Sequence, residues 1–134
     1  SDLSKALNWA RDNKVESVTL LGADGGGDDH YLGNLFLILE NSYDFKLKII
    51  TNSGQFDLVN NKEFSSYPTQ RVSLFCMNKE ARVSSSGLKY ELDGYSFDNL
   101  YGATLNEATG DSFGVSCDNP DVSILVYRGN EETK

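Results

Sequence analysis

A glycine-rich, acidic stretch at residues 22–34 holds the residues of this sequence that are best suited to chemistry. It reads Gly-Ala-Asp-Gly-Gly-Gly-Asp-Asp-His-Tyr-Leu-Gly-Asn. The β-branched and apolar run at 18–21 precedes it, and a helical pattern follows it. A strand, a glycine-rich turn and a helix in this order bring together free backbone N–H groups and a positive helix end, which favours binding of phosphate or another anion. The expected apolar face of that helix consists of Leu32, Leu35, Phe36 and Leu39.

The charges of this stretch limit what it can bind. Three glycines at 25–27 allow positive φ angles and a close approach of a ligand to the backbone. Asp24, Asp28 and Asp29 would repel a bare phosphate, so a phosphate site here requires a metal ion or a cationic substrate. The alternative is a helix-entry loop in which Asp28 or Asp29 only caps the helix.

Length, charge and cysteine usage narrow the class of protein. The chain has 134 residues and a net charge of −8, so nucleic acid and anionic membranes are unfavourable partners, whereas a small cationic ligand would be attracted. No apolar run approaches the ~20 residues that cross a bilayer. Cys76 and Cys117 lie in apolar strand patterns, which favours free thiols and a cytoplasmic location over a disulfide framework. His30 is the single histidine, so one chain cannot form a histidine metal cage.

The first third of the chain reads as an α/β unit. Helical spacing of apolar residues at 3–10 predicts a short helix, and the alternating run at 45–50 predicts a second strand. With the strand at 18–21 and the helix after the glycines, this predicts parallel strands. Two strands and two helices cannot bury both faces of a sheet. We therefore expect residues 1–53 to be the C-terminal half of a larger α/β catalytic domain, or to lean on a partner.

From residue 55 the pattern becomes strand-like, and turn residues separate short runs. The strongest run places Val72, Leu74 and Cys76 on one face. Short strands at regular spacing predict an all-β sandwich or a flattened barrel over residues 54–134. The expected strands are at 56–59, 64–67, 71–77, 81–84, 88–90, 95–97, 112–117 and 122–127.

Three segments, in order, resemble thiamine pyrophosphokinases. The stretch at 22–34 resembles their Gly-Gly-Arg-x-Asp-His segment, although Gly27 stands where the arginine is usual. Residues 87–93, Gly-Leu-Lys-Tyr-Glu-Leu-Asp, resemble a segment of the thiamine-binding β-domain. Residues 103–107, Ala-Thr-Leu-Asn-Glu, resemble its Ser-x-Ser-Asn-Glu segment, with Leu105 in place of the second serine.

The resemblance implies a reaction and an assembly. The reaction is transfer of pyrophosphate from ATP to thiamine, with Mg²⁺, giving thiamine diphosphate and AMP. The assembly is a homodimer whose active site lies between the α/β part of one subunit and the β-part of the other. Ser1 and Asp2 match the end of a Lys-x-x-Thr-Asp motif of the family, so the sequence looks truncated. We therefore expect a chain that lacks most of the ATP–magnesium side and is inactive alone.

The resemblance also implies roles on the phosphate side. Asp29 would be catalytic, and Gly25, Gly26 and Asp28 would bind nucleotide or phosphate. Asp2 would help to hold the metal, whereas the residues alone indicate only a helix cap there. Pyrophosphoryl transfer depends on positioning and on neutralisation of charge, so the missing arginine at Gly27 bears directly on activity.

The implied thiamine side combines a carboxylate, an aromatic ring and amides. Asp29 can meet the permanent charge of the thiazolium ring, Tyr90 can stack on a ring, and Asn106 can pair with the aminopyrimidine edge. The structural alternatives are a half-buried strand aromatic at Tyr90 and a turn residue at Asn106. The implied thiamine-binding set is Asp29, Asn34, Tyr90, Ala103, Thr104 and Asn106.

Two other functions compete with this interpretation. One is a non-catalytic β-sandwich module that binds a metal or a small ligand, with the Asp/Gly loop as a calcium site; the loop lacks the regular oxygen-ligand spacing of an EF-hand. The other is a transferase of nucleotide sugars or phosphosugars that shares only the α/β half. A strand that enters the loop and a helix that leaves it favour an enzyme, whereas a loop between two strands favours the module.

Overall fold

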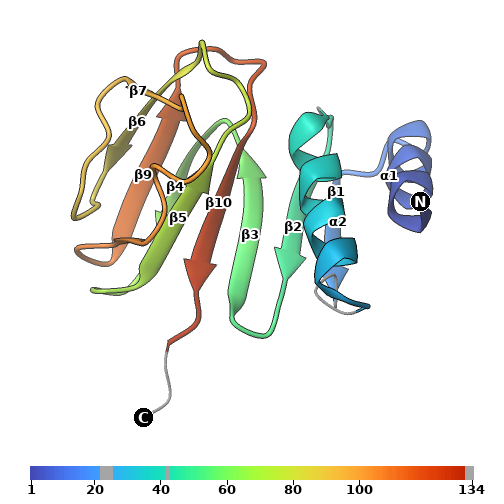
Figure 1. The fold of residues 1–134 in the computed structure, drawn as a ribbon, viewed down its shortest axis with the longest axis horizontal. Coiled ribbons are helices and arrows are strands. Elements are labelled where there is room, and N and C mark those ends of the chain that lie inside the picture. Colours follow the sequence, from blue (N-terminus) through green and yellow to red (C-terminus); the bar gives the residue numbers. More distant parts are fainter. Residues whose placement is uncertain (22–25, 42, 132–134) are drawn as a thin grey trace.

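Two sheets and two helices make up the fold in the computed structural model, which describes residues 1–21, 26–41 and 43–131 (Figure 1). The helices are α1 (Asp2–Asp12) and α2 (Asp28–Glu40). The strands are β1 (Ser17–Leu21), β2 (Lys46–Ile50), β3 (Gly54–Val59), β4 (Asn61–Ser65), β5 (Arg71–Phe75), β6 (Arg82–Ser86), β7 (Tyr95–Ser96), β8 (Asn106–Glu107), β9 (Ser112–Cys117) and β10 (Ile124–Gly129).

A six-stranded sheet runs through most of the molecule in the order β1-β2-β3-β10-β5-β8. Its β1–β2 pair is parallel, and α2 makes the connection that a parallel pair requires. Every other pair in it is antiparallel. The second sheet, β4-β9-β6-β7, is antiparallel throughout. The fold is thus mostly β, and its single described parallel pair lies at one edge.

Different elements cover the two faces of the six-stranded sheet, and they do so at opposite ends of the sheet. On one face, alternating residues of β5 and β10 pack against the four-stranded sheet and form a β-sandwich. On the other face, residues of β2 and β3 pack against α2 and α1. Figure 1 shows the sandwich at one end of the sheet, with α2 alongside β1 and β2 and α1 beyond β1. Because successive side chains of a strand point to opposite faces, β3 and β10 contribute to both cores.

The sandwich core confirms the strongest strand prediction. Val72, Leu74 and Cys76 are all fully buried, as their alternation indicates. The rings of Phe64 and Phe113 stack across the β4–β9 pair, with centroids 5.0 Å apart. The prediction of a β-sandwich in this part of the chain is therefore correct.

The predicted apolar face of α2 is partly wrong. Leu32 and Phe36 are exposed, whereas the buried residues are Asn34 and Ile38. The buried face is rotated by one residue and runs through Tyr31, Asn34, Leu35 and Ile38. This helix is apolar around most of its circumference, so its spacing alone allows two faces at i, i+3, i+4 and i+7.

The strand predicted at 88–90 is absent from the described structure, where Leu88 makes only an isolated bridge to Ala108. Gly87 has φ +78°, which turns the chain out of the extended conformation. The Glu91 carboxylate then accepts hydrogen bonds from the backbone N–H groups of Gly87 and Leu88, at 3.1 and 2.9 Å. The Glu91 side chain therefore binds backbone N–H groups that would bind a neighbouring strand if this segment were itself a strand.

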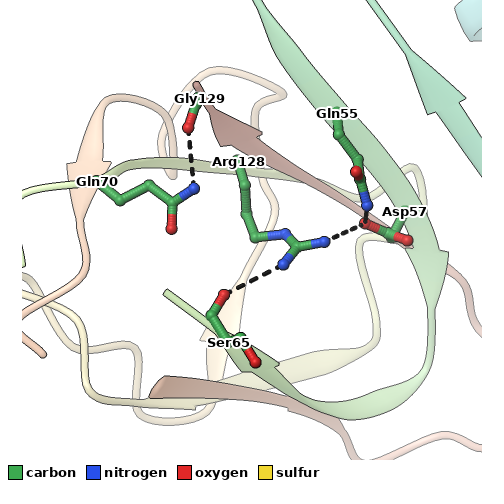
Figure 2. A network of polar contacts seen from close by, with 6 residues as sticks. All are labelled: Gln55, Asp57, Ser65, Gln70, Arg128 and Gly129. Atoms are coloured by element: carbon green, nitrogen blue, oxygen red, sulfur yellow. Dashed lines mark hydrogen bonds and ion pairs between the residues drawn. The ribbon is translucent and has the colours of Figure 1, made fainter. Parts of the chain in front are cut away.

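A polar network lies where β3, β10 and β4 meet (Figure 2). The Arg128 guanidinium donates to the Asp57 carboxylate at 3.1 Å and to the Ser65 carbonyl at 3.1 Å. Gln55 donates a second hydrogen bond to the same carboxylate at 2.9 Å, and Gln70 donates to the Gly129 carbonyl at 2.9 Å. The network ties the strand that both cores share to the second sheet.

The six-stranded sheet continues through the predicted boundary at residues 53 and 54. β2 and β3 form an antiparallel pair across it, from Leu47↔Leu58 to Ile50↔Gln55. The division into 1–53 and 54–134 stays a prediction, as does the proposal that the β1–α2–β2 unit is half of a larger α/β domain. Neither described helix is long and apolar enough to span a membrane.

Candidate functional site

The start of α2 forms the first candidate region. Its N-cap is Gly27, with φ +103°, and no side chain there caps the helix. Asp28 and Asp29 occupy the first turn and are exposed, and Asp29 Oδ1 accepts a hydrogen bond from the His30 backbone N–H at 2.9 Å. A Cβ on Gly26 would come within 3.2 Å of His30 Nδ1. The carboxylates are therefore presented to solvent on a turn in which two glycines have positive φ.

The order of elements around this turn is strand and then helix, as predicted from the sequence. β1 precedes the turn and α2 follows it, so it does not join two strands. The described residues also contain no group of three or more acidic, histidine or cysteine side chains that could hold a metal. Asp24 and the predicted phosphate-binding Gly25 lie outside the described residues.

Asn34 lies one helical turn and a half after these carboxylates, on the buried face of α2. The residue is only 8% exposed. The structure therefore places this predicted thiamine-binding residue among the buried residues of α2, close to the first turn of the helix.

The second candidate region is built around the Asn106 side chain at the start of β8. Its Oδ1 accepts from the Tyr90 backbone N–H at 3.0 Å, and its Nδ2 donates to the Tyr90 carbonyl at 2.7 Å. Oδ1 also accepts from the Glu107 N–H at 2.9 Å. Asn106 is buried, and its amide is largely used in fixing the backbone of Tyr90. It therefore positions the loop that carries the tyrosine.

Tyr90 is neither in a strand nor half-buried: its side chain is 63% exposed in the loop that Asn106 holds. The Lys89 ammonium lies 5.4 Å from the centre of its ring. The face of this ring thus already attracts a cation, as the electron-rich face of an aromatic ring does. An exposed ring on an anchored backbone is a suitable platform for a flat cationic ligand.

Ala103 and Thr104 also support the region through the backbone. The buried Ala103 accepts a hydrogen bond from the Leu74 N–H at 2.9 Å, and Thr104 Oγ1 donates to the Tyr101 carbonyl at 2.8 Å. Leu105 follows with φ +60°, and its N–H donates to Ser73 Oγ at 2.9 Å. These contacts fix a loop in which the side chains of Tyr101 and Leu105 are exposed.

A groove of about 430 Å³ lies beside Asn106. Sequence reasoning missed Arg71 and Glu107, which line it and face each other in the β5–β8 pair. It also missed Leu105 as an exposed side chain. The available signal was the Asn106-Glu107 pair of the motif, since β8 places alternate residues on opposite faces. The groove is lined by Tyr67, Pro68, Thr69, Arg71, Leu105, Asn106, Glu107, Asn130 and Glu131.

The two candidate regions lie at opposite edges of the six-stranded sheet. The glycine turn follows β1, at one edge, and Asn106 belongs to β8, at the other, with four strands between them. Five strand spacings of about 4.8 Å separate the edges by roughly 24 Å. One chain therefore does not bring Asp29 and Asn106 to the same small ligand.

Asp2 lies outside both candidate regions. It lies exposed in the first turn of α1, after the Ser1 N-cap, whose side chain accepts from the Ser4 N–H at 3.2 Å. Among the described residues, Asp2 is not part of any group of three or more acidic, histidine or cysteine side chains. Its role as a metal ligand stays a prediction.

This chain resembles known proteins in part of its sequence and in its fold. Residues 54–127 match the family model described as thiamin pyrophosphokinase, substrate-binding domain. Among solved structures, thiamine pyrophosphokinase from Bacillus subtilis matches with a TM-score of 0.78 at 19% identity, covering 98% of this chain and 64% of that one. The thiamin pyrophosphokinase from Geobacillus thermodenitrificans gives 0.72 at 23% identity, covering 99% and 63%.

A third structure, thiamin pyrophosphokinase from Candida albicans, gives a TM-score of 0.63 at 18% identity and covers 85% of this chain and 44% of that one. The chain thus spans less than two thirds of the length of these three structures. No curated protein sequence matches the chain. The family model covers more than half of the sequence and includes both Tyr90 and Asn106. The chain belongs to the thiamin pyrophosphokinase family, through its substrate-binding domain.

Proposed function

We propose that this chain is the thiamine-binding part of a thiamine diphosphokinase, which transfers pyrophosphate from ATP to thiamine. In that reaction the hydroxyl oxygen of thiamine bonds to the β-phosphorus of ATP, the bond to the α-phosphate oxygen breaks, and AMP leaves. The single observation that carries the proposal is the family match over residues 54–127, which includes the loop clamped by Asn106.

The geometry of that loop fits the chemistry of thiamine. The ring of Tyr90 is exposed and attracts one cation, Lys89 Nζ, so a thiazolium ring could replace that ammonium group over the ring. Asn106 keeps one amide hydrogen free after its contacts with the backbone of Tyr90 and Glu107. Its main proposed role is to hold Tyr90 in place, with a direct contact to the aminopyrimidine edge as a second role.

The start of α2 is the proposed phosphate and catalytic side. The N–H groups at a helix start favour the anionic diphosphate, and the Asp29 carboxylate is proposed to attract the thiazolium and to accept the hydroxyl proton. Asn34, on the buried face of the same helix, is the proposed amide contact for thiamine on this side. Gly27 supplies no cation. The negative charge of ATP must therefore be neutralised by bound Mg²⁺ and by residues elsewhere.

The proposed site is shared by two chains. Asp29 and Asn106 are on opposite edges of one sheet, so a homodimer that places β1 of one chain near β8 of its partner would complete two equivalent sites. Exposed apolar side chains on the helical side support such an assembly, or a further α/β layer that completes this half. They are Trp9, Leu21, Leu32, Phe36 and Ile50.

Thiamine titrations of variants test the β-side of the site. Tyr90→Leu removes the ring and should weaken thiamine by about 1 kcal/mol or more, and Asn106→Ala should weaken it by roughly 1–3 kcal/mol by releasing the loop. Met77→Ala is the control, because Met77 is an exposed apolar side chain that belongs neither to the proposed site nor to the exposed helical side. Calorimetric titration at a concentration where the protein is dimeric measures all three. Equal affinities for the wild type, Tyr90→Leu and Asn106→Ala would contradict the assignment.

Mixing two variants tests whether the site is shared. Asp29→Asn and Asn106→Ala should each lose most binding alone, the first because an amide cannot supply the charge of Asp29. In an equimolar mixture half of the dimers pair one variant with the other. Each such dimer has one site with two native residues, so about a quarter of the wild-type sites should return. No recovery after exchange of subunits would show that each site lies within one chain.

A further inference from the structure

A second groove lies on the face of the six-stranded sheet that α2 does not cover. It has a volume of about 560 Å³, and its floor is β1, β2 and β3. Leu47 and Ile49 point toward the helices, so their neighbours in β2 point into the groove. The second sheet covers this face only farther along, and the turn from β3 to β4 forms the wall. The polar side chains that line the groove are Ser17, Thr19, Lys46, Lys48, Asp57, Asn60, Asn61 and Lys62.

The sheet register concentrates positive charge in this groove. Lys46 and Lys48 alternate along β2 and pair across the sheet with Ser17 and Thr19 of β1. Lys62 adds a third ammonium from β4, where it lies 5.4 Å from the centre of the Phe64 ring. The chain as a whole has a net charge of −8, but three lysines make the charge around this groove positive.

No carboxylate pairs with these lysines in the described part of the chain, where the ion pairs are Arg11–Asp12 and Arg128–Asp57. Asp57, the acidic residue that lines the groove, pairs with Lys48 in the sheet register. Its carboxylate is nevertheless bound by Arg128 at 3.1 Å and by Gln55 at 2.9 Å (Figure 2). The groove therefore keeps its positive charge, and neighbouring ammonium groups repel one another until an anion binds.

The wall of the groove is fixed in position. Asn60 Nδ2 donates to the carbonyls of Asn119 and Val122, both at 2.8 Å, and this holds the turn that carries Asn61 and Lys62. Hydroxyl groups of Ser17 and Thr19 on the floor add hydrogen-bond donors. A fixed wall, hydroxyl donors and three lysine ammonium groups suit an anion with several charged oxygens.

We propose that this groove is a binding site for a small phosphate-bearing polyanion of the pyrophosphate class. It is separate from the glycine turn, because Ser17 and Lys46 begin β1 and β2 whereas the turn follows the other end of β1. A five-residue strand puts roughly 13–17 Å between those ends. The volume is within the range of sites for small organic ligands. The inference does not depend on thiamine binding.

Calorimetric titration with inorganic pyrophosphate, in buffer free of magnesium, tests the proposal. Lys46→Gln/Lys48→Gln should weaken binding by about tenfold or more, since each lost charge-assisted contact has an effect of that size. Lys5→Gln/Lys79→Gln is the control, because it removes the same charge from exposed positions on α1 and after β5. It should change the affinity less than twofold. Thermal unfolding of both double variants verifies that they fold.

Three results would overturn the site. The first is a wild-type protein that does not bind pyrophosphate at millimolar concentration. The second is an equal loss of affinity in both double variants, which would show only a response to net charge. The third is competition by sulfate as strong as by pyrophosphate, which would show an unselective anion surface. Unchanged thiamine affinity in Lys46→Gln/Lys48→Gln separates this result from the test of the proposed function.

Discussion

The β-sandwich half and the helical half of this molecule cover the shared six-stranded sheet in different ways. In the sandwich, two sheets face each other and the core contains fully buried side chains from both. In the helical half, helices cover one sheet face only. Large apolar side chains are exposed in both halves: Leu32 and Phe36 on α2, and Tyr90 and Leu105 in loops of the sandwich. The comparison shows that the sandwich exposes apolar side chains mainly in its loops, whereas the helical part exposes them on a helix face.

The shared sheet couples these unequal halves. In β3, Phe56 packs against the helices, whereas the next residue, Asp57, belongs to the network with Arg128. A substitution in one half therefore affects a strand that also contributes to the core of the other half. The following experiments measure how far this coupling extends.

Truncation of equivalent core leucines should have the largest effect. Leu74 in the sandwich and Leu47 in the helical half are both buried, at 0% and 3% exposure. Leu74→Ala should lower the free energy of unfolding by about 3–5 kcal/mol, and Leu47→Ala by about 2–3 kcal/mol, because the open half can relax around the cavity. Urea denaturation measures both. A larger loss for Leu47→Ala would reverse the comparison.

Removal of the buried charge pair should come next. Asp57→Asn leaves Arg128 without its carboxylate and should cost about 1–3 kcal/mol of unfolding free energy. Hydrogen exchange should then speed up in β3 and β4 together, since the guanidinium also binds the Ser65 carbonyl of β4. Lys62→Gln, at an exposed position in the same strand, is the control and should leave exchange unchanged. Faster exchange confined to β1 and β2 would argue against a coupling through this pair.

Polar substitution of the exposed helix face should act on association and hardly on the fold. Leu32→Ser/Phe36→Ser removes apolar surface from α2 and should shift sedimentation toward the monomer. The free energy of unfolding measured at low protein concentration should change by roughly 0.5 kcal/mol or less per site. Unaltered sedimentation would place the association surface elsewhere.

The smallest expected effect is a pH dependence from Cys76. Burial raises the pKa of this thiol above its ordinary 9.0, because the core disfavours the thiolate. A raised pKa in the folded state means that the folded protein holds the proton more tightly. Stability is therefore complete below pH 9 and falls as the pH rises toward the folded pKa. Cys76→Ala should flatten this fall between pH 8 and 10, as measured by urea denaturation. An identical slope in the variant would show that the fall has another origin.

The parts of the fold that follow from local pattern were predictable. Alternation identified Val72 and Leu74 as core residues, and the pattern around 18–40 indicated a strand, a turn and a helix. The orientation of α2 was not predictable, because its sequence is apolar on adjacent faces and only the packing of Ile38 selects one of them. The loop at Tyr90 was hidden for a similar reason, since the contacts that hold it come from Glu91 and from the distant Asn106.

The candidate site could likewise be predicted only in part from the sequence. Motif resemblance identified Tyr90 and Asn106, and the structure brings them together. Spacing along the chain could not show that Asp29 lies at the opposite edge of the sheet, because the order of strands depends on where β10 inserts. The roles assigned to these residues in binding and catalysis stay predictions.

The position of β10 has a consequence for how the chain folds during synthesis. This last strand lies between β3 and β5 and pairs with both, from Ile124↔Val59 on one side and Leu125↔Phe75 on the other. Until it leaves the ribosome, those two strands have no common neighbour, and each exposes an unpaired edge. Contacts between residues so far apart in sequence form slowly. The six-stranded sheet can therefore close only after β10 has been synthesised.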